Sequence, residues 1–254
     1  MSTVGLPHSL PPSLPHGEII RKAENLIWEF ARLRHGCDNK IRQFFGLNFD
    51  LVFDEHIYPE WEVSIEEDCE LGSDDNGKKV LAKTVVRMGK LCILIDRCLH
   101  PNRHDPRRTF TCWHELGHVI LHGSWLKMQT LAGQQDSQLV TTEETIKPSN
   151  RTIDIMEQEA NLFASHAAAP CWFVQMVVEQ KFSLESPFRY IGPSTYCLVA
   201  EQRPYYRLCN SIADLCKNIA YLIQHRFGGL SIEALSYRVR DSGLIHDQSP
   251  AGQQ

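Results

Sequence analysis

The segment TFTCWHELGHVILH constrains this chain more than any other, because it holds two histidines four residues apart. On a helix, residues at i and i+4 lie on one face, so the imidazoles of His114 and His118 can hold one zinc ion. Glu115, next to the first histidine, can then reach a water molecule on that ion. The segment therefore predicts a zincin-type active-site helix, with His114 and His118 as zinc ligands and Glu115 as the catalytic base. The plainer alternative is an ordinary helix with two solvent-facing histidines.

Helix-boundary signals surround this segment. Asp105 is a suitable N-cap, and Pro106 fits the first helical position, where a backbone N–H group would have no helical partner. Gly123 is a common type of helix stop. We therefore expect a helix over residues 105–122. Residues 124–150 offer little apolar surface to bury, which predicts a mobile or irregular connection.

The third zinc ligand has to come from another segment. His122 continues the i+4 series, but on a straight helix it lies about 12 Å along the axis from His114. That is too far for both residues to share an ion that is bound at about 2 Å. The longer metzincin pattern requires Gly and His at two later positions, where this chain has Leu121 and Ser124. A metzincin site is therefore excluded.

A second helical segment, IDIMEQEANLFASHAAAP, offers two carboxylates. Glu157 and Glu159 stand at opposite margins of its apolar face, and helical periodicity does not decide between them. Either would complete a His2Glu site with an open position for water, or both simply interact with the helix dipole. Asn161 shares a face with Glu157 and could hydrogen-bond a ligand of the same site, whereas Glu159 shares its face with Phe163. This difference favours Glu157 as the third metal ligand.

The composition limits the class of function. The chain has 254 residues, with 26 Lys+Arg, 31 Asp+Glu and a formal net charge of −5. Such a balance argues against non-specific binding to nucleic acid or to an anionic membrane, and no run approaches the ~20 apolar residues of a membrane span. Nine cysteines without a CxxC pair, and a Pro-rich start without a signal-peptide pattern, are typical of a cytoplasmic protein with reduced thiols.

Two charged stretches allow a binding function. Residues 60–75 contain eight carboxylates, which form either a docking face for a basic partner or, as we expect, a solvated loop. Four arginines around the predicted active-site helix could contact DNA, namely Arg97, Arg103, Arg107 and Arg108. Asp96 and Asp105 stand among them, so we expect no direct binding to nucleic acid.

The remaining pattern predicts an α+β fold. Residues 17–46 have apolar residues at helical spacing. Alternating apolar residues predict strands near residues 49–53 and 61–65, and residues 79–87 and 91–96 are typical of a hairpin or of two neighbouring strands. We therefore expect a small antiparallel or mixed sheet, the active-site helix and a helical C-terminal region. The predicted divisions are a flexible Pro-rich tail, a zinc metallopeptidase domain, a helical C-terminal region and a flexible tail, at residues 1–16, 17–175, 176–245 and 246–254.

The run RRTFTCWHELGHVILH followed by EQEANLFASHAAAP resembles the ImmA/IrrE metallopeptidases. Their pattern is a strand, then an R-x-x-F-T-x-x-H-E-x-x-H helix, then E-x-x-A-N-x-F-A ending in Pro. LCILID supplies the strand here, and Arg107, Phe110 and Thr111 stand at the matching positions. The tail FGGLSIEALSYRVRDSGLI resembles the family's C-terminal segment, in which a Ser-led helix ends in Gly-Leu. The resemblance covers residues 79–170 and 227–245.

This resemblance implies a cytosolic zinc peptidase that acts on a protein substrate. In the family pattern a glutamate stands three residues before the Ala, and Glu157 occupies that position. Several members are similar in cutting a helix-turn-helix transcriptional repressor, which induces stress-response or mobile-element genes. The alternative is a non-catalytic zinc-containing regulator that acts by binding a partner protein. The oligomeric state stays open.

Overall fold

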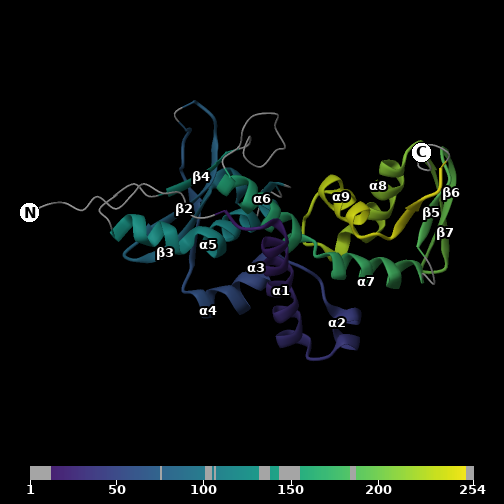
Figure 1. The fold of residues 1–254 in the computed structure, drawn as a ribbon, viewed down its shortest axis with the longest axis horizontal. Coiled ribbons are helices and arrows are strands. Elements are labelled where there is room, and N and C mark those ends of the chain that lie inside the picture. The colour runs from purple at the N-terminus through teal and green to yellow at the C-terminus, as the bar shows by residue number, and fades with distance from the viewer. Residues whose placement is uncertain are drawn as a thin grey trace, which may run out of the picture. The chain divides into compact units, whose positions relative to one another are not determined.

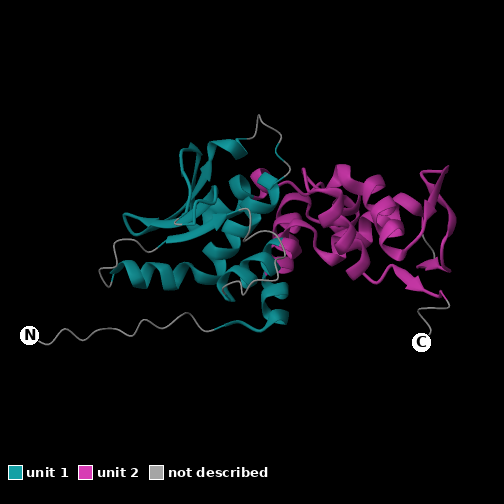
Figure 2. Cartoon of the chain, turned by 90° about the horizontal axis from the view of Figure 1, so that it is seen from above, with its two compact units in different colours: residues 1–22, 53–164 teal, residues 23–52, 165–254 magenta. Residues whose placement is uncertain are grey.

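The computed structural model describes residues 13–74, 76–100, 105, 107–131, 138–142, 155–183 and 187–249. The chain divides into two compact units (Figure 2). Unit 1 comprises Met1–Lys22 and Phe53–Ala164, and unit 2 comprises Ala23–Val52 and Ser165–Gln254. The sequence predicts domain boundaries at residues 175 and 245. Whether the chain folds as separate parts at these boundaries stays a prediction.

Unit 1 contains a four-stranded mixed sheet with the strand order β1-β3-β2-β4. The strands are β1 (Ser64–Cys69), β2 (Val80–Arg87), β3 (Lys90–Asp96) and β4 (Gln138–Thr142). β2 and β3 form the predicted antiparallel hairpin, with Met88 and Gly89 at positive φ in the turn. β1 pairs with β3 in parallel, and β4 pairs with β2 in antiparallel fashion. This mixed sheet and its helices confirm the predicted α+β class.

The helix that carries the two histidines, α5 (Arg107–Leu131), lies against β2 and β3 (Figure 1). Its start agrees with the predicted cap, since the Asp105 carboxylate accepts the backbone N–H of Arg107 at 2.9 Å. Pro106 lies outside the described residues. The predicted stop at Gly123 is wrong, because this glycine serves a close packing contact: a Cβ there would lie 2.5 Å from Leu91 Cδ1.

The continuation of α5 also corrects the prediction for residues 124–150. Residues 124–131 are helical and residues 138–142 form β4, so an irregular connection is wrong for both. β4 is short and ends in polar residues, so its sequence does not suggest a buried strand. Thr141 is nevertheless buried, because the strand pairs with β2. Residues 132–137 and 143–150 lie outside the described residues.

The N-terminal third needs two further corrections. The predicted helix over residues 17–46 is interrupted at Gly36, whose φ of +79° ends the first helix. The strand expected near residues 49–53 is wrong, because the buried residues Phe49, Val52, Phe53 and Ile57 recur at helical spacing. The helices are α1 (His16–His35), α2 (Asp38–Phe44), α3 (Phe49–Val52), the π-helical turn η1 (Phe53–Ile57) and α4 (Tyr58–Trp61).

Unit 2 holds the helical C-terminal region and two small sheets. Its later helices are α7 (Cys171–Phe182), α8 (Ile212–Ile223) and α9 (Ile232–Asp241). α9 starts at Ser231, whose hydroxyl accepts the Ala234 N–H, and Gly243 follows it, as the resemblance implied. The strands were not predicted: β5 (Phe188–Tyr190) pairs with β8 (Ile245–Asp247), and β6 (Ser194–Ala200) pairs with β7 (Arg203–Cys209). No helix in the described part of the chain combines the length and apolar character that crossing a membrane requires.

Candidate metal centre

Three side chains from two helices meet in the interior of unit 1. His114 and His118 on α5 are both 0% exposed, and their Nε2 atoms lie 3.0 Å apart. Glu157 comes from α6 (Ile155–Ala168). Its Oε2 lies 3.1 Å from Nε2 of His114, and its Oε1 lies 3.2 Å from Nε2 of His118. The structure thus brings together the three residues that the sequence put forward as zinc ligands, with one atom of each within 4.8 Å of the others.

A glycine between the two histidines sets the distance from α5 to α6. A Cβ at Gly117 would lie 3.2 Å from both the Cα and the carbonyl oxygen of Ala160, and 3.3 Å from the Cβ of Phe163. The backbones can approach this closely because neither Gly117 nor Ala160 carries a bulky side chain. α6 therefore stands near enough for Glu157 to reach the histidines.

Hydrogen bonding at the rim of this group leaves lone pairs at its centre. His114 Nδ1 lies 2.9 Å from Asn161 Oδ1, and since an amide oxygen only accepts, Nδ1 carries the proton. The Nε2 atom of His114 then presents a lone pair inwards. Glu157 Oε2 is buried without a hydrogen-bond donor. Converging lone pairs in a buried place are costly unless a cation lies between them, so these residues fit a zinc ion.

The pKa values of the three residues reflect burial and the approach of the carboxylate to the two imidazoles. Burial lowers the pKa of His118 to about 4, which keeps this imidazole neutral, the form that binds metals. Burial alone would lower the pKa of His114 as well, but the nearby Glu157 carboxylate raises it. Burial alone would raise the pKa of Glu157, but the nearby imidazoles of His114 and His118 bring it well below its usual range, so Glu157 is an ionised carboxylate.

Glu115 lies fully buried next to His114 in the chain. Its Oε2 accepts a hydrogen bond from the hydroxyl of Thr84 on β2, while its Oε1 is buried without a partner. Burial raises the pKa of Glu115 to about 7, against the opposing charge of His114. A carboxyl group that titrates near neutrality is suited both to accept and to return a proton.

Residues 91–170 match the IrrE N-terminal-like domain, Peptidase_M78. These residues belong to the ImmA/IrrE family of metallopeptidases. The matched segment runs from β3 to the end of α6, so it contains His114, Glu115, His118 and Glu157. It confirms the resemblance over these residues, and the C-terminal part at residues 227–245 lies outside the match. Comparison with curated protein sequences gives no match.

The second carboxylate of α6, Glu159, contacts a different histidine. Glu159 Oε2 lies 3.0 Å from His122 Nε2, and His122 Nδ1 lies 3.1 Å from His118 Nδ1. The structure therefore places Glu157 at the histidine pair and Glu159 behind it. The sequence analysis missed the contact between His122 and Glu159. The available signal was the i+4 series of three histidines, because a third histidine on the same buried face needs a polar partner.

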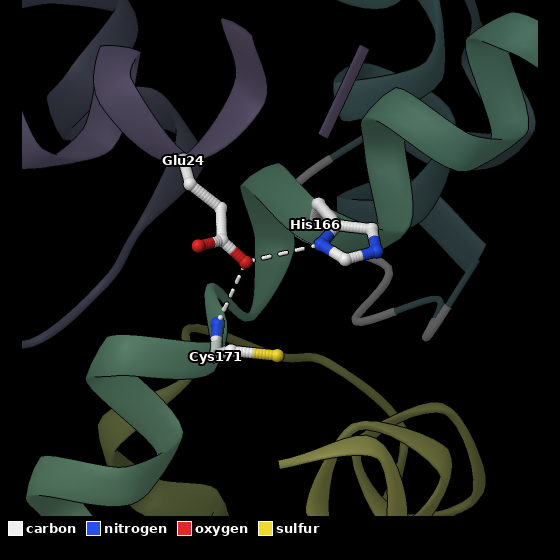
Figure 3. Close-up of side chains that lie close together, drawn as sticks. All are labelled: Glu24, His166 and Cys171. Carbon is white, nitrogen blue, oxygen red and sulfur yellow. Dashed lines mark hydrogen bonds and ion pairs between the residues drawn. The ribbon is translucent and has the colours of Figure 1, made fainter. Parts of the chain in front are cut away.

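A second group of possible metal ligands lies within unit 2 and consists of Glu24, His166 and Cys171 (Figure 3). Glu24 Oε1 lies 3.0 Å from His166 Nδ1 and accepts the backbone N–H of Cys171 at 3.0 Å. The guanidinium of Arg238 lies against the same atoms, with its Nη2 3.0 Å from both Cys171 Sγ and His166 Nδ1. Because a permanent positive charge already faces these groups, we interpret them as a structural link between helices.

The arginines near α5 pair with carboxylates. Arg97 Nη2 lies 3.0 Å from Glu70 Oε1, and Arg108 pairs with Glu67. Arg107 pairs with Asp105 at the start of the helix, and Arg103 lies outside the described residues. In these pairs each arginine offsets the charge of a carboxylate. A DNA-binding face would need the positive charge of the arginines, and an acidic docking face would need the negative charge of the carboxylates.

Proposed function

We propose that this chain is a zinc-dependent endopeptidase that hydrolyses a peptide bond in a protein substrate. The observation that carries the proposal is the buried meeting of His114, His118 and Glu157, with their inward lone pairs, beside the buried carboxyl of Glu115. A purely structural zinc site is usually closed by four protein ligands. Among the residues that the structure describes the group has three, which leaves a position for water or substrate.

In this proposal each side chain has one task. His114, His118 and Glu157 hold the metal, and Asn161 keeps the proton of His114 on the outer nitrogen. Bound zinc supplies Lewis-acid activation of the scissile carbonyl and of water. Glu115 accepts the proton of the attacking water and passes it to the leaving amine, for which a pKa of about 7 is well placed. Thr84 orients the Glu115 carboxyl by hydrogen bonding to Oε2.

For the biological setting we propose a cytoplasmic enzyme that cuts a helix-turn-helix repressor in a stress response or a mobile element. The support for the substrate is the family resemblance. The support for the compartment is that no disulfide joins any of the nine cysteines, all of which lie in the described part of the chain.

The proposal is tested with Glu115→Gln. The amide cannot act as a base, and it leaves the metal ligands intact, so we expect zinc content to be kept and hydrolysis to fall by about 10²–10⁴-fold. Zinc is measured by elemental analysis, and hydrolysis by incubation with candidate repressors, with and without a chelator. Glu179→Gln is the matched control, because it makes the same chemical change at an exposed position of α7. Full hydrolysis by Glu115→Gln would refute the mechanism. A protein whose biological effect survives in Glu115→Gln would instead be a zinc-containing regulator.

A further inference from the structure

We propose that Glu159 and His122 are positioning residues, which hold His118 in the tautomer and orientation that metal binding needs. This inference rests on the proposed zinc site and adds a directed series of hydrogen bonds behind it, which we call the relay. The relay runs from His118 Nδ1 to His122 Nδ1 over 3.1 Å, and from His122 Nε2 to Glu159 Oε2 over 3.0 Å. All three side chains are at most 5% exposed.

The direction of each hydrogen bond follows from the Glu159 carboxylate, which is the end of the relay farthest from the metal ligands. The Glu159 carboxylate receives three donors: the Ser13 hydroxyl at 2.7 Å, the Leu14 N–H at 2.8 Å, and His122 Nε2. Oε1 of Glu159 accepts two hydrogen bonds, from the Ser13 hydroxyl and the Leu14 backbone N–H, which is the arrangement of a carboxylate that only accepts. His122 Nε2 is therefore a donor.

The remaining protons follow step by step. In this proposal His122 is neutral and has one N–H group, so donation from Nε2 makes its Nδ1 an acceptor. His118 must then donate from Nδ1, which leaves the lone pair of His118 on Nε2. That atom faces Glu157 Oε1 at 3.2 Å and His114 Nε2 at 3.0 Å. The relay therefore orients the lone pair of His118 Nε2 towards His114 Nε2 and Glu157 Oε1.

The two histidine ligands are thus held in different ways. His114 donates to an amide oxygen, that of Asn161. His118 donates to an imidazole that is itself bound to a carboxylate, which makes His118 a stronger electron donor and restricts rotation of its ring. Ser13 and Leu14, which precede α1, hold the Glu159 carboxylate in turn. Burying a carboxylate and an imidazole is costly, so this pair is weak evidence for stability, and its effect on His118 Nδ1 is the role that the geometry supports.

The test measures zinc affinity by competition with a chromophoric chelator, in Glu159→Gln and in His122→Phe. Both changes keep the side-chain volume close to that of the original. We expect each to weaken zinc binding by about 10–100-fold, the usual effect of removing a residue behind a metal ligand. Glu157→Ala, which removes a ligand, should lose far more. His166→Phe is the matched control, since it removes a buried histidine that also pairs with a glutamate, but in unit 2.

A spectroscopic measurement separates positioning from a general loss of stability. In the cobalt-substituted protein, the Nδ1 proton of His118 should give a paramagnetically shifted, slowly exchanging NMR signal. We expect faster exchange of this proton in Glu159→Gln and in His122→Phe, and an unchanged signal in His166→Phe. Folded variants with the zinc affinity and the proton signal of the wild type would overturn the relay alone. A wild-type protein that binds no zinc would overturn the proposed function and the relay with it.

Discussion

Gly117→Ala tests whether the close approach of α5 to α6 builds the metal centre. The added Cβ would lie 3.2 Å from the Cα and carbonyl oxygen of Ala160, and 3.3 Å from the Cβ of Phe163. These are backbone and first side-chain atoms, which cannot rotate away. Contacts this short are tighter than ordinary van der Waals distances, so the two helices have to move apart by a few tenths of an ångström.

The displacement should affect the metal more than the fold. Overpacking costs about 1–3 kcal/mol, while alanine gains about 1 kcal/mol over glycine inside a helix, so the net loss of stability is about 0–2 kcal/mol. Metal–ligand distances tolerate changes of only about 0.2 Å. Because His114 and His118 move with α5 while Glu157 moves with α6, we expect zinc binding to weaken at least about tenfold.

Chelator competition gives the zinc affinity, and thermal unfolding of the metal-free protein gives the stability. Gly123→Ala is the matched control on the same helix. Its Cβ would meet Leu91 Cδ1 at 2.5 Å, and that atom is a side-chain end on β3 rather than backbone on α6. We expect Gly123→Ala to alter stability and to keep the zinc affinity. A folded Gly117→Ala protein with wild-type zinc affinity would refute the argument that helix spacing limits the site.

Two further predictions concern charge. The pKa of Asp96 falls from 3.8 to about 2, because Lys79 and the N–H groups of Cys98 and Leu71 outweigh burial of the carboxyl. A group with a depressed pKa stabilises the fold above its unfolded pKa, and this stabilisation is lost as pH falls through the folded pKa. Asp96→Asn should therefore cost about 2–3 kcal/mol at pH 7 and about half of that at pH 3. Equal urea midpoints for the variant and the wild type at pH 7 would contradict this. The second prediction is that elemental analysis finds one zinc ion per chain. The positive charge of Arg238 faces the group of Glu24, His166 and Cys171 and disfavours a second cation there. A second tightly bound zinc ion that is lost in Cys171→Ser would show that Arg238 moves away to admit it.

Features that depend on neighbouring residues could be predicted from the order of the amino acids. The i+4 spacing of His114 and His118 places both imidazoles on one helix face whatever surrounds the helix. The hairpin of β2 and β3 follows from two apolar runs around Gly89, and the start of α9 follows from its capping serine, Ser231. The family resemblance also depended only on residue order, and the match over residues 91–170 confirmed it.

Features that depend on contacts between distant segments could be seen only in the folded chain. Glu157 and Glu159 are two residues apart and equally placed on their helix, so the packing of α6 on α5 through Gly117 determined which one meets the histidines. Gly123 looked like a helix stop, yet it lies inside a continuing helix, where the side chain of Leu91 packs against it. The hydrogen bond between His122 and Glu159 joins residues 37 positions apart. Helix periodicity carries no information on such distances, because the separation of two elements is set by the side chains packed between them.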